Sequence, residues 1–310
     1  MRLLNETDVA AAAERIAGRV RRTPTLSLAA GEVADVPTVF KLEQMQHTGS
    51  FKVRGAFNAL LAGDVPAAGV ICASGGNHGI AVAHAARALG VPCEVFLPLS
   101  SSPVKVQFLR ALGAGVRQTG SVYAEAFEAM ETRRAETGAT AIHAYDQATT
   151  VAGQGTLFRE WLEQAPHLTT LLVAVGGGGL LAGALAALGH RLKLVAVEPR
   201  HAPTLAEALD ADARVDVAVS GLAADSLGAR RIGEIGFALA RHHGVVSLTV
   251  GDDEIRAAQR WLWQHARIAA EPGGAAAYAA LLSRAYRPGA EERVGVLICG
   301  ANTDPAALSS

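Results

Sequence analysis

The chain has 310 residues, of which 50% are hydrophobic and 18% are charged, and its formal net charge is −1. A chain of this length can bury a sizeable core, and its composition excludes a disordered or fibrous protein. The sequence contains no basic tract, so we expect no nucleic-acid partner.

Three cysteines, Cys72, Cys93 and Cys299, have neither CxxC nor mixed Cys/His spacing. This pattern predicts neither a disulfide framework nor a metal site. The N-terminal sequence MRLLNETDVAAAAERI reaches charged residues within six positions and lacks the apolar core of a signal peptide. We therefore expect a cytoplasmic protein.

An uncharged run of nineteen residues, from Leu171 to Gly189, has about the length of a membrane-spanning helix. Four consecutive glycines, Gly176 to Gly179, lie within it and would weaken a helix. The run is better explained by a buried strand, a turn and a helix, so we expect no membrane segment.

Short apolar runs alternate along the chain with alanine- and leucine-rich helical patterns. The predicted strands are Val70–Ala73, Cys93–Leu97, Leu171–Val175, Leu194–Val197 and Val294–Ile298. The predicted helices are Ile80–Leu89, Val104–Leu112, Tyr123–Glu136 and Leu180–Leu188. Runs that are apolar on both faces are typical of parallel sheets covered by helices. The sequence therefore predicts an α/β fold built from two open, doubly wound parallel sheets.

The strands form two groups, which separate near Asp64–Pro66 and again near Tyr145–Thr150. We predict a small inserted domain at residues 69–146. The large, cofactor-binding domain would consist of residues 1–68 and 147–310.

Lys52 is the first candidate for chemistry, in the segment Thr48 to Gly55. A lone lysine is usually a solvated surface group. This lysine follows a Gly-Ser turn and an aromatic residue, and an apolar helical run comes after it. A lysine partly desolvated at a cleft is nucleophilic and can form a Schiff base.

Two glycine-rich loops follow predicted strands. The first contains Ser74, Gly75, Gly76, Asn77 and His78, and its backbone amides could meet an anion at a helix N-terminus, although an ordinary strand-to-helix turn would look similar. The second is Gly176 to Gly179, whose amides could form a nest for a phosphate group. It does not match a nucleoside-triphosphate P-loop. Glu198 follows about 20 residues later, so a dinucleotide site is a weaker alternative.

Cys299 ends the last predicted strand, at the edge where open α/β sheets bind ligands. By itself it is better explained as a small buried apolar residue. The lysine, the two loops and the thiol together match the aldehyde, ring hydroxyl, phosphate and ring nitrogen of one cofactor.

The sequence resembles the fold-type II pyridoxal-phosphate enzymes, specifically the branch of serine/threonine dehydratases and serine racemases. The resemblance extends from Thr23-Pro24 to Asn302 and rests on seven segments in the family's order: SFKVRGAFNAL, ASGGNHG, AGQGT, VGGGGLLAG, VAVEP, EPGGAAA and ICGAN. The SVKDR-like lysine segment of the cysteine synthase branch is missing. The resemblance implies a fold like that of the tryptophan synthase β subunit, with pyridoxal 5'-phosphate in the cleft between the domains.

The resemblance also implies roles for individual residues. Lys52 would hold the cofactor as a Schiff base and act as the general base, and Phe51 would pack on its ring. Asn77 would bind the ring hydroxyl, Gly176 to Gly179 the phosphate, and the loop from Ser74 to His78 the substrate carboxylate. Gly221 and Glu271 would line the edge of the ring, and Cys299 would face its nitrogen.

Three departures from the family pattern bear on function. Racemases, and the hydroxyaspartate dehydratases like them, have a serine where this chain has Gly75, so the second acid/base group is missing. Tyr145 replaces an asparagine of the racemases. Thr204 replaces an aspartate of the family's cation site near Glu198, so we expect no tight cation site.

These features predict a dehydratase, or ammonia-lyase, that converts L-threonine or L-serine to a 2-oxo acid and ammonia, and we expect a homodimer. The alternatives are a serine racemase and a dehydratase of hydroxyaspartate or phenylserine. A non-catalytic amino-acid sensor and a nucleotide-binding protein are less consistent with Lys52 and the uninterrupted glycine loop.

Overall fold

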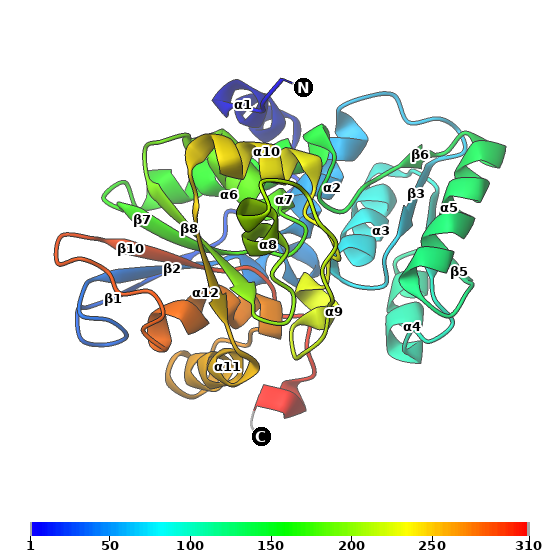
Figure 1. Ribbon diagram of the computed structural model, residues 1–310. Helices are drawn as coiled ribbons and strands as arrows, with labels where there is room; N and C mark the ends of the chain where they lie inside the picture. The colour runs from blue at the N-terminus through cyan, green and yellow to red at the C-terminus, as the bar shows by residue number, and fades with distance from the viewer. Residues whose placement is uncertain (1, 309–310) are drawn as a thin grey trace.

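Figure 1 shows the computed structural model, which describes residues 2–308 as an α/β protein with two separate sheets. The larger sheet has the order β1-β2-β10-β7-β8-β9, and the smaller has the order β5-β4-β3-β6. The α/β fold with two sheets confirms the predicted class.

The larger sheet is built from both ends of the chain. Its strands are β1 (Thr25–Leu28), β2 (Thr38–Leu42), β7 (Thr170–Ala174), β8 (Lys193–Pro199), β9 (Val246–Val250) and β10 (Val294–Ile298). All neighbours pair in parallel except β1, which pairs antiparallel with β2 at the edge. A short connection allows this antiparallel pair, whereas parallel neighbours need a longer crossover.

Helices cover both faces of the larger sheet. On one face lie α6 (Ala148–Gln164) and α7 (Gly179–Leu188), with α1 (Glu6–Arg15) and α10 (Glu234–His243) packed against them. On the other face α12 (Pro272–Leu282) packs on the strands and α11 (Asp252–Ala266) packs on α12. Two short helices, α8 (Thr204–Asp210) and α9 (Ala224–Leu227), lie between β8 and α10 in the chain.

The smaller sheet is entirely parallel and consists of β3 (Val70–Ala73), β4 (Cys93–Leu97), β5 (Gly115–Gln118) and β6 (Thr140–Ala141). Helix α5 (Tyr123–Thr137) packs on β3 and β4, and so does α3 (Asn77–Leu89), which also contacts α4 (Pro103–Ala111). All four strands lie within residues 69–146. The domain boundaries themselves remain our proposal.

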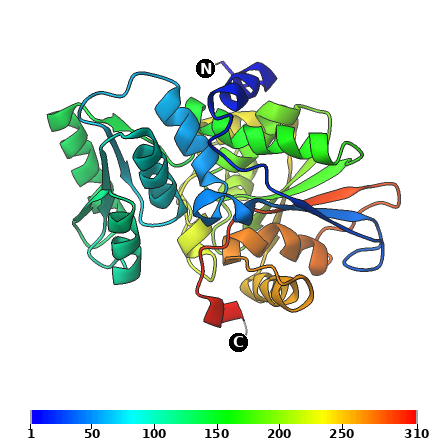
Figure 2. The same cartoon turned by 180° about the vertical axis from the view of Figure 1, so that it is seen from behind.

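Helix α2 (Lys52–Leu61) joins the two halves. It contacts α3 of the smaller half and α6 of the larger half, and the view from behind shows it between them (Figure 2). Its Arg54 is buried, with ion pairs to Glu43 (2.5 Å) and Glu160 (2.9 Å). Lys41, also buried, pairs with Glu160 at 2.5 Å. This network fixes α2 to the larger half.

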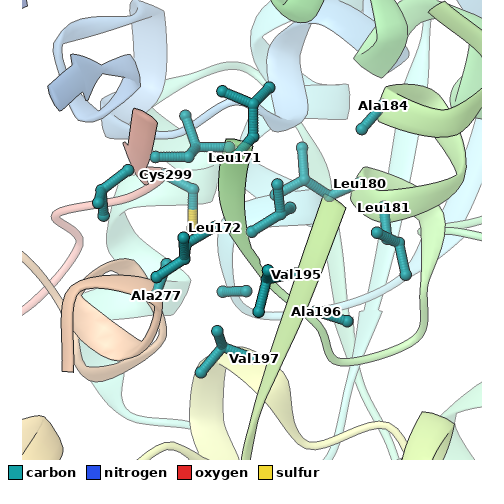
Figure 3. Close-up of a cluster of buried hydrophobic side chains, with 14 of the residues drawn as sticks. Leu171, Leu172, Leu180, Leu181, Ala184, Val195, Ala196, Val197, Ala277 and Cys299 are labelled. Atoms are coloured by element: carbon teal, nitrogen blue, oxygen red, sulfur yellow. The ribbon is translucent and has the colours of Figure 1, made fainter. Parts of the chain in front are cut away.

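The main core lies in the larger half, where side chains of β7, β8 and α7 pack together (Figure 3). The uncharged run from residue 171 to 189 forms most of β7, the glycine turn and α7. No helix of the described residues is long and apolar enough to span a membrane. All five predicted strands and all four predicted helices are present, with ends shifted by at most three residues.

Candidate active site

A pocket lies between the two halves, at the carboxyl ends of β7 and β10. Asn77 lines it from the smaller half and Tyr145 from the segment that returns to the larger half. The larger half contributes the rest of the lining: Phe51, Lys52, Ala174, Gly176, Gly177, Gly178, Gly179, Leu180, Ser226, Leu227, Glu271, Gly273 and Cys299. The pocket therefore brings together the lysine, the four-glycine loop, Asn77 of the first loop and the strand-end thiol.

Lys52 is the first residue of α2, and its amine faces this pocket. Its Nζ donates a hydrogen bond to the carbonyl oxygen of Ala144 at 2.8 Å and lies 5.1 Å from the centre of the Phe51 ring. Burial lowers the pKa of Lys52 to about 8, although Cys299 and Glu271 oppose this shift. A substantial fraction of the amine is therefore neutral just above neutral pH, as a nucleophile or a base requires.

The glycine loop forms the N-terminus of α7. Gly178 has a φ of 88°, and the amides of Gly177, Gly178 and Gly179 have no hydrogen-bond acceptor within the described chain. The ring of Tyr145 lies against the loop, because a Cβ on Gly177 would come within 2.4 Å of it. Unpaired amides at a helix N-terminus favour an anion.

Asn77 and Glu271 meet across the pocket. The Nδ2 of Asn77 donates to Oε1 of Glu271 at 2.5 Å. Burial raises the pKa of Glu271 to about 7, even though this hydrogen bond lowers it. Glu271 therefore changes protonation near neutral pH.

Cys299 lies at the end of β10 and is buried. Its Sγ lies 3.6 Å from the carbonyl oxygen of Gly273, to which it donates. Burial, with Glu271 nearby, raises the pKa of Cys299 well above its ordinary value. The thiol is thus protonated at neutral pH and can be only a weak hydrogen-bond partner.

The loop from Ser74 to His78 leads into α3, which begins at Asn77. Of this loop only Asn77 lines the pocket itself. His78 is buried, and its Nε2 lies 2.8 Å from the carbonyl oxygen of Ile142. Burial and nearby Lys52 lower the pKa of His78 to about 3. It is therefore neutral, and its contacts are those of a structural histidine.

Gly221 is not among the residues that line the pocket. It is exposed, and a Cβ there would meet Asp252 and His201 at about 2.9 Å. Ser226 and Leu227 of α9 line the pocket instead. No glycine or charge pattern distinguishes these two residues in the sequence, so the motifs missed them.

The region near Glu198 is closed by the protein itself. Glu198 is buried and accepts hydrogen bonds from the amides of Leu205 (2.7 Å) and Ala206 (2.8 Å) at the start of α8. Thr204 Oγ1 lies 3.1 Å from Glu198 and 2.6 Å from the carbonyl oxygen of Gly176. The described residues contain no cluster of metal ligands. Glu198 therefore already accepts hydrogen bonds from two helix amides, and Thr204 offers no carboxylate as a second ligand.

The fold and the pocket define an α/β enzyme with a buried lysine and an anion site in a cleft between two sheets. The chain belongs to the family of pyridoxal-phosphate dependent enzymes, whose family model matches residues 16–300. Its cofactor is therefore pyridoxal 5'-phosphate.

Individual relatives place the chain among amino-acid lyases and racemases. It is 39% identical to phenylserine dehydratase from Ralstonia pickettii, over 94% of this chain and 90% of the relative. It is 36% identical to L-threonine ammonia-lyase from Geobacter sulfurreducens, over 99% of this chain and 78% of the relative. The structure of maize serine racemase superposes with a TM-score of 0.94 at 29% identity, covering 99% of this chain and 96% of that one.

The residues of the pocket fit this cofactor. The amine of Lys52 forms no ion pair with the described residues and is available for its aldehyde, and unpaired amides on glycines 177–179 are available for its phosphate. Among the described residues that line the pocket, Lys52 is the one cationic side chain, so helix and amide dipoles would have to balance the phosphate charge.

Proposed function

We propose that the protein is a dehydratase that converts an L-β-hydroxy amino acid with an uncharged side chain, L-threonine or L-serine, to a 2-oxo acid and ammonia. The observation that carries this proposal is the combination of a base, Lys52, with Gly75 where racemases have a second acid/base group. Elimination requires a base on only one face of the substrate, whereas racemisation requires one on each face.

In this proposal Lys52 holds the cofactor aldehyde and Phe51 packs against the ring. Asn77 would donate to the ring hydroxyl, Gly176 to Gly179 would bind the phosphate, and Cys299 would be the residue near the ring nitrogen. When bound, the cofactor withdraws electrons from the substrate Cα and acidifies its proton.

Lys52 then has two roles, as the anchor and as the base that removes the Cα proton. Its pKa of about 8 suits proton transfer near neutral pH. The buried thiol of Cys299 holds its own proton and would leave the ring nitrogen neutral. A neutral ring is a weaker electron sink than a pyridinium and favours elimination over transamination.

The lining of the pocket favours a substrate with an uncharged side chain. A second carboxylate, as in hydroxyaspartate, would find no arginine among the described lining residues and would lie in the same pocket as Glu271. Burying an unpaired carboxylate is costly. These observations count against hydroxyaspartate.

Phenylserine is a second candidate substrate. The similarity to phenylserine dehydratase favours it. The lining also includes the apolar side chains of Leu180 and Leu227 and the ring of Tyr145, against which a phenyl group could pack.

The test is release of 2-oxo acid and ammonia by the purified holoenzyme with L- and D-serine, threonine, hydroxyaspartate and phenylserine. We expect release from L-threonine and L-serine and none from hydroxyaspartate. A kcat/KM higher for L-phenylserine than for L-threonine would select the second candidate. Formation of D-serine at a rate comparable to pyruvate would overturn the proposal in favour of a racemase.

The homodimer and the cytoplasmic location also remain proposals. Sedimentation velocity of the holoenzyme tests the first, and cell fractionation tests the second.

A further inference from the structure

A chain of hydrogen bonds links three segments around the pocket through Asn302, which follows β10. The Nδ2 of Asn302 donates to the carbonyl oxygen of Thr48 at 2.8 Å and to Oδ1 of Asn77 at 2.6 Å. The Nδ2 of Asn77 in turn donates to Glu271 at 2.5 Å. These hydrogen bonds thus connect the turn before Lys52, the start of α3 and the start of α12.

The carbonyl of Thr48 fixes the donor and acceptor of each of these hydrogen bonds. A backbone carbonyl such as that of Thr48 can only accept, so Asn302 must present its NH₂ group there. The same NH₂ group faces Asn77, which must therefore present its oxygen to Asn302. The NH₂ group of Asn77 is then turned toward the pocket and Glu271, with one N–H left over for a bound group.

We propose that Asn302 is a positioning residue, which holds the amide of Asn77 with its NH₂ group toward the cofactor site. Asn302 does not line the pocket itself, and it reaches the site through Asn77. The proposal rests on the binding of pyridoxal phosphate and on the role proposed for Asn77. It does not depend on which amino acid is the substrate.

The turn before Lys52 is shaped around Asn302. Thr48 has a φ of 65°, which is strained for a β-branched residue, and its carbonyl is held by Asn302. Gly49 has a φ of 75°, and a Cβ there would lie 2.6 Å from Oδ1 of Asn302. The carbonyl of Gly49 accepts from the amide of Ala301 at 2.9 Å. Asn302 therefore lies in a fixed position although it is exposed to solvent.

The test compares Asn302→Asp with Asn302→Leu, two changes of nearly equal size. With aspartate the donor becomes an acceptor, so Asn77 has to turn its NH₂ group toward the new carboxylate and its oxygen toward the cofactor. With leucine no polar partner remains, and the amide of Asn77 is free to take either orientation.

Two quantities are measured: the dissociation constant of pyridoxal phosphate by equilibrium dialysis, and the visible absorption band at saturating cofactor. Both are measured at about 1 M salt, where the Debye length is about 3 Å and the added charge is screened. We expect Asn302→Asp to bind the cofactor about tenfold more weakly than the unmodified protein, with a shifted band. The dissociation constant of Asn302→Leu should lie between those of the unmodified protein and Asn302→Asp.

This order separates positioning from a structural role. At an exposed site, a merely structural role would make the polar aspartate milder than leucine and would leave the band of the saturated protein unchanged. Asn5→Asp and Asn5→Leu are the matched controls, because Asn5 caps α1 by accepting from the amide of Thr7. Neither control should change the dissociation constant or the band.

Equal binding by both Asn302 variants and the unmodified protein, or weaker binding by leucine than by aspartate, would overturn the proposal. If Asn302→Asp does not fold, an unchanged band in saturated Asn302→Leu rejects it. A wrong assignment of the dehydratase activity would appear separately, as a lack of 2-oxo acid release by unmodified protein that still binds the cofactor.

Discussion

Replacing Lys52 with methionine should abolish turnover and at the same time stabilise the cofactor-free protein. The pKa of Lys52 falls from its ordinary value of 10.5 to about 8, so the native protein binds this proton less tightly than the unfolded chain does. Below about pH 8 the amine is charged in both states, and its burial costs the native state roughly 3 kcal/mol.

Methionine removes this cost and fills a similar volume, but the hydrogen bond to Ala144 is lost, which offsets about 1 kcal/mol. We therefore expect Lys52→Met to be more stable by about 2 kcal/mol at pH 7. The difference should shrink as the pH rises from about 8 to about 10.5, because the native and then the unfolded lysine lose their charge.

Urea unfolding of the cofactor-free proteins at about pH 7 and about pH 10 measures this difference directly. Lys193→Met is the control, because Tyr286 and Glu292 raise the pKa of Lys193, so its loss should lower stability. A Lys52→Met protein that is no more stable than the unmodified one at pH 7, or whose advantage does not depend on pH, would refute the reasoning. Retention of more than a small percentage of activity would refute the role of Lys52 itself.

Three further predictions concern the cofactor site, the cation and the choice of reaction. Gly178→Asp should weaken cofactor binding far more than Gly178→Asn. Both substitutions strain a position with a φ of 88°, but only aspartate repels the phosphate. Equal cofactor affinities of the two variants in equilibrium dialysis would place the phosphate elsewhere. A chelator should change activity and melting temperature little, because Glu198 already accepts hydrogen bonds from α8 amides and from Thr204. A melting temperature that falls by several degrees with the chelator and is restored by Mg²⁺ would contradict this. Gly75→Ser should raise D-serine formation relative to pyruvate in a chiral assay, since it adds a hydroxyl where racemases have one. The new Cβ would lie 3.0 Å from Leu97, which must move slightly. An unchanged product ratio in a folded variant would count against the role of Gly75.

Strands that are buried on both faces could be predicted from the sequence, and strands whose burial depends on distant partners could not. β3 and β10 are continuous apolar runs, and their predicted ends are those observed. β2 contains Lys41, whose burial depends on a pairing with Glu160, 119 residues further along the chain. Nothing local to β2 indicates that partner, so the strand has no clear sequence signal.

In the pocket, too, some lining residues could be predicted from the sequence and others could not. Loops that follow parallel strands gather at one edge of a sheet, so glycines 176–179 and Cys299 could be expected to lie together. Tyr145 and Leu227 line the same pocket, but they come from segments without a regular pattern. Their positions depend on how the two halves pack, which no short motif encodes.

The place of β10 in the larger sheet has a consequence for how the protein is made. Residues 294–298 pair with β2 on one side and with β7 on the other, so this central strand is synthesised after both of its neighbours. Until it leaves the ribosome, the edges of β2 and β7 remain unpaired and open to aggregation. The smaller sheet, complete by residue 141, can form much earlier. The edges of β2 and β7 therefore need protection until residues 294–298 have been synthesised.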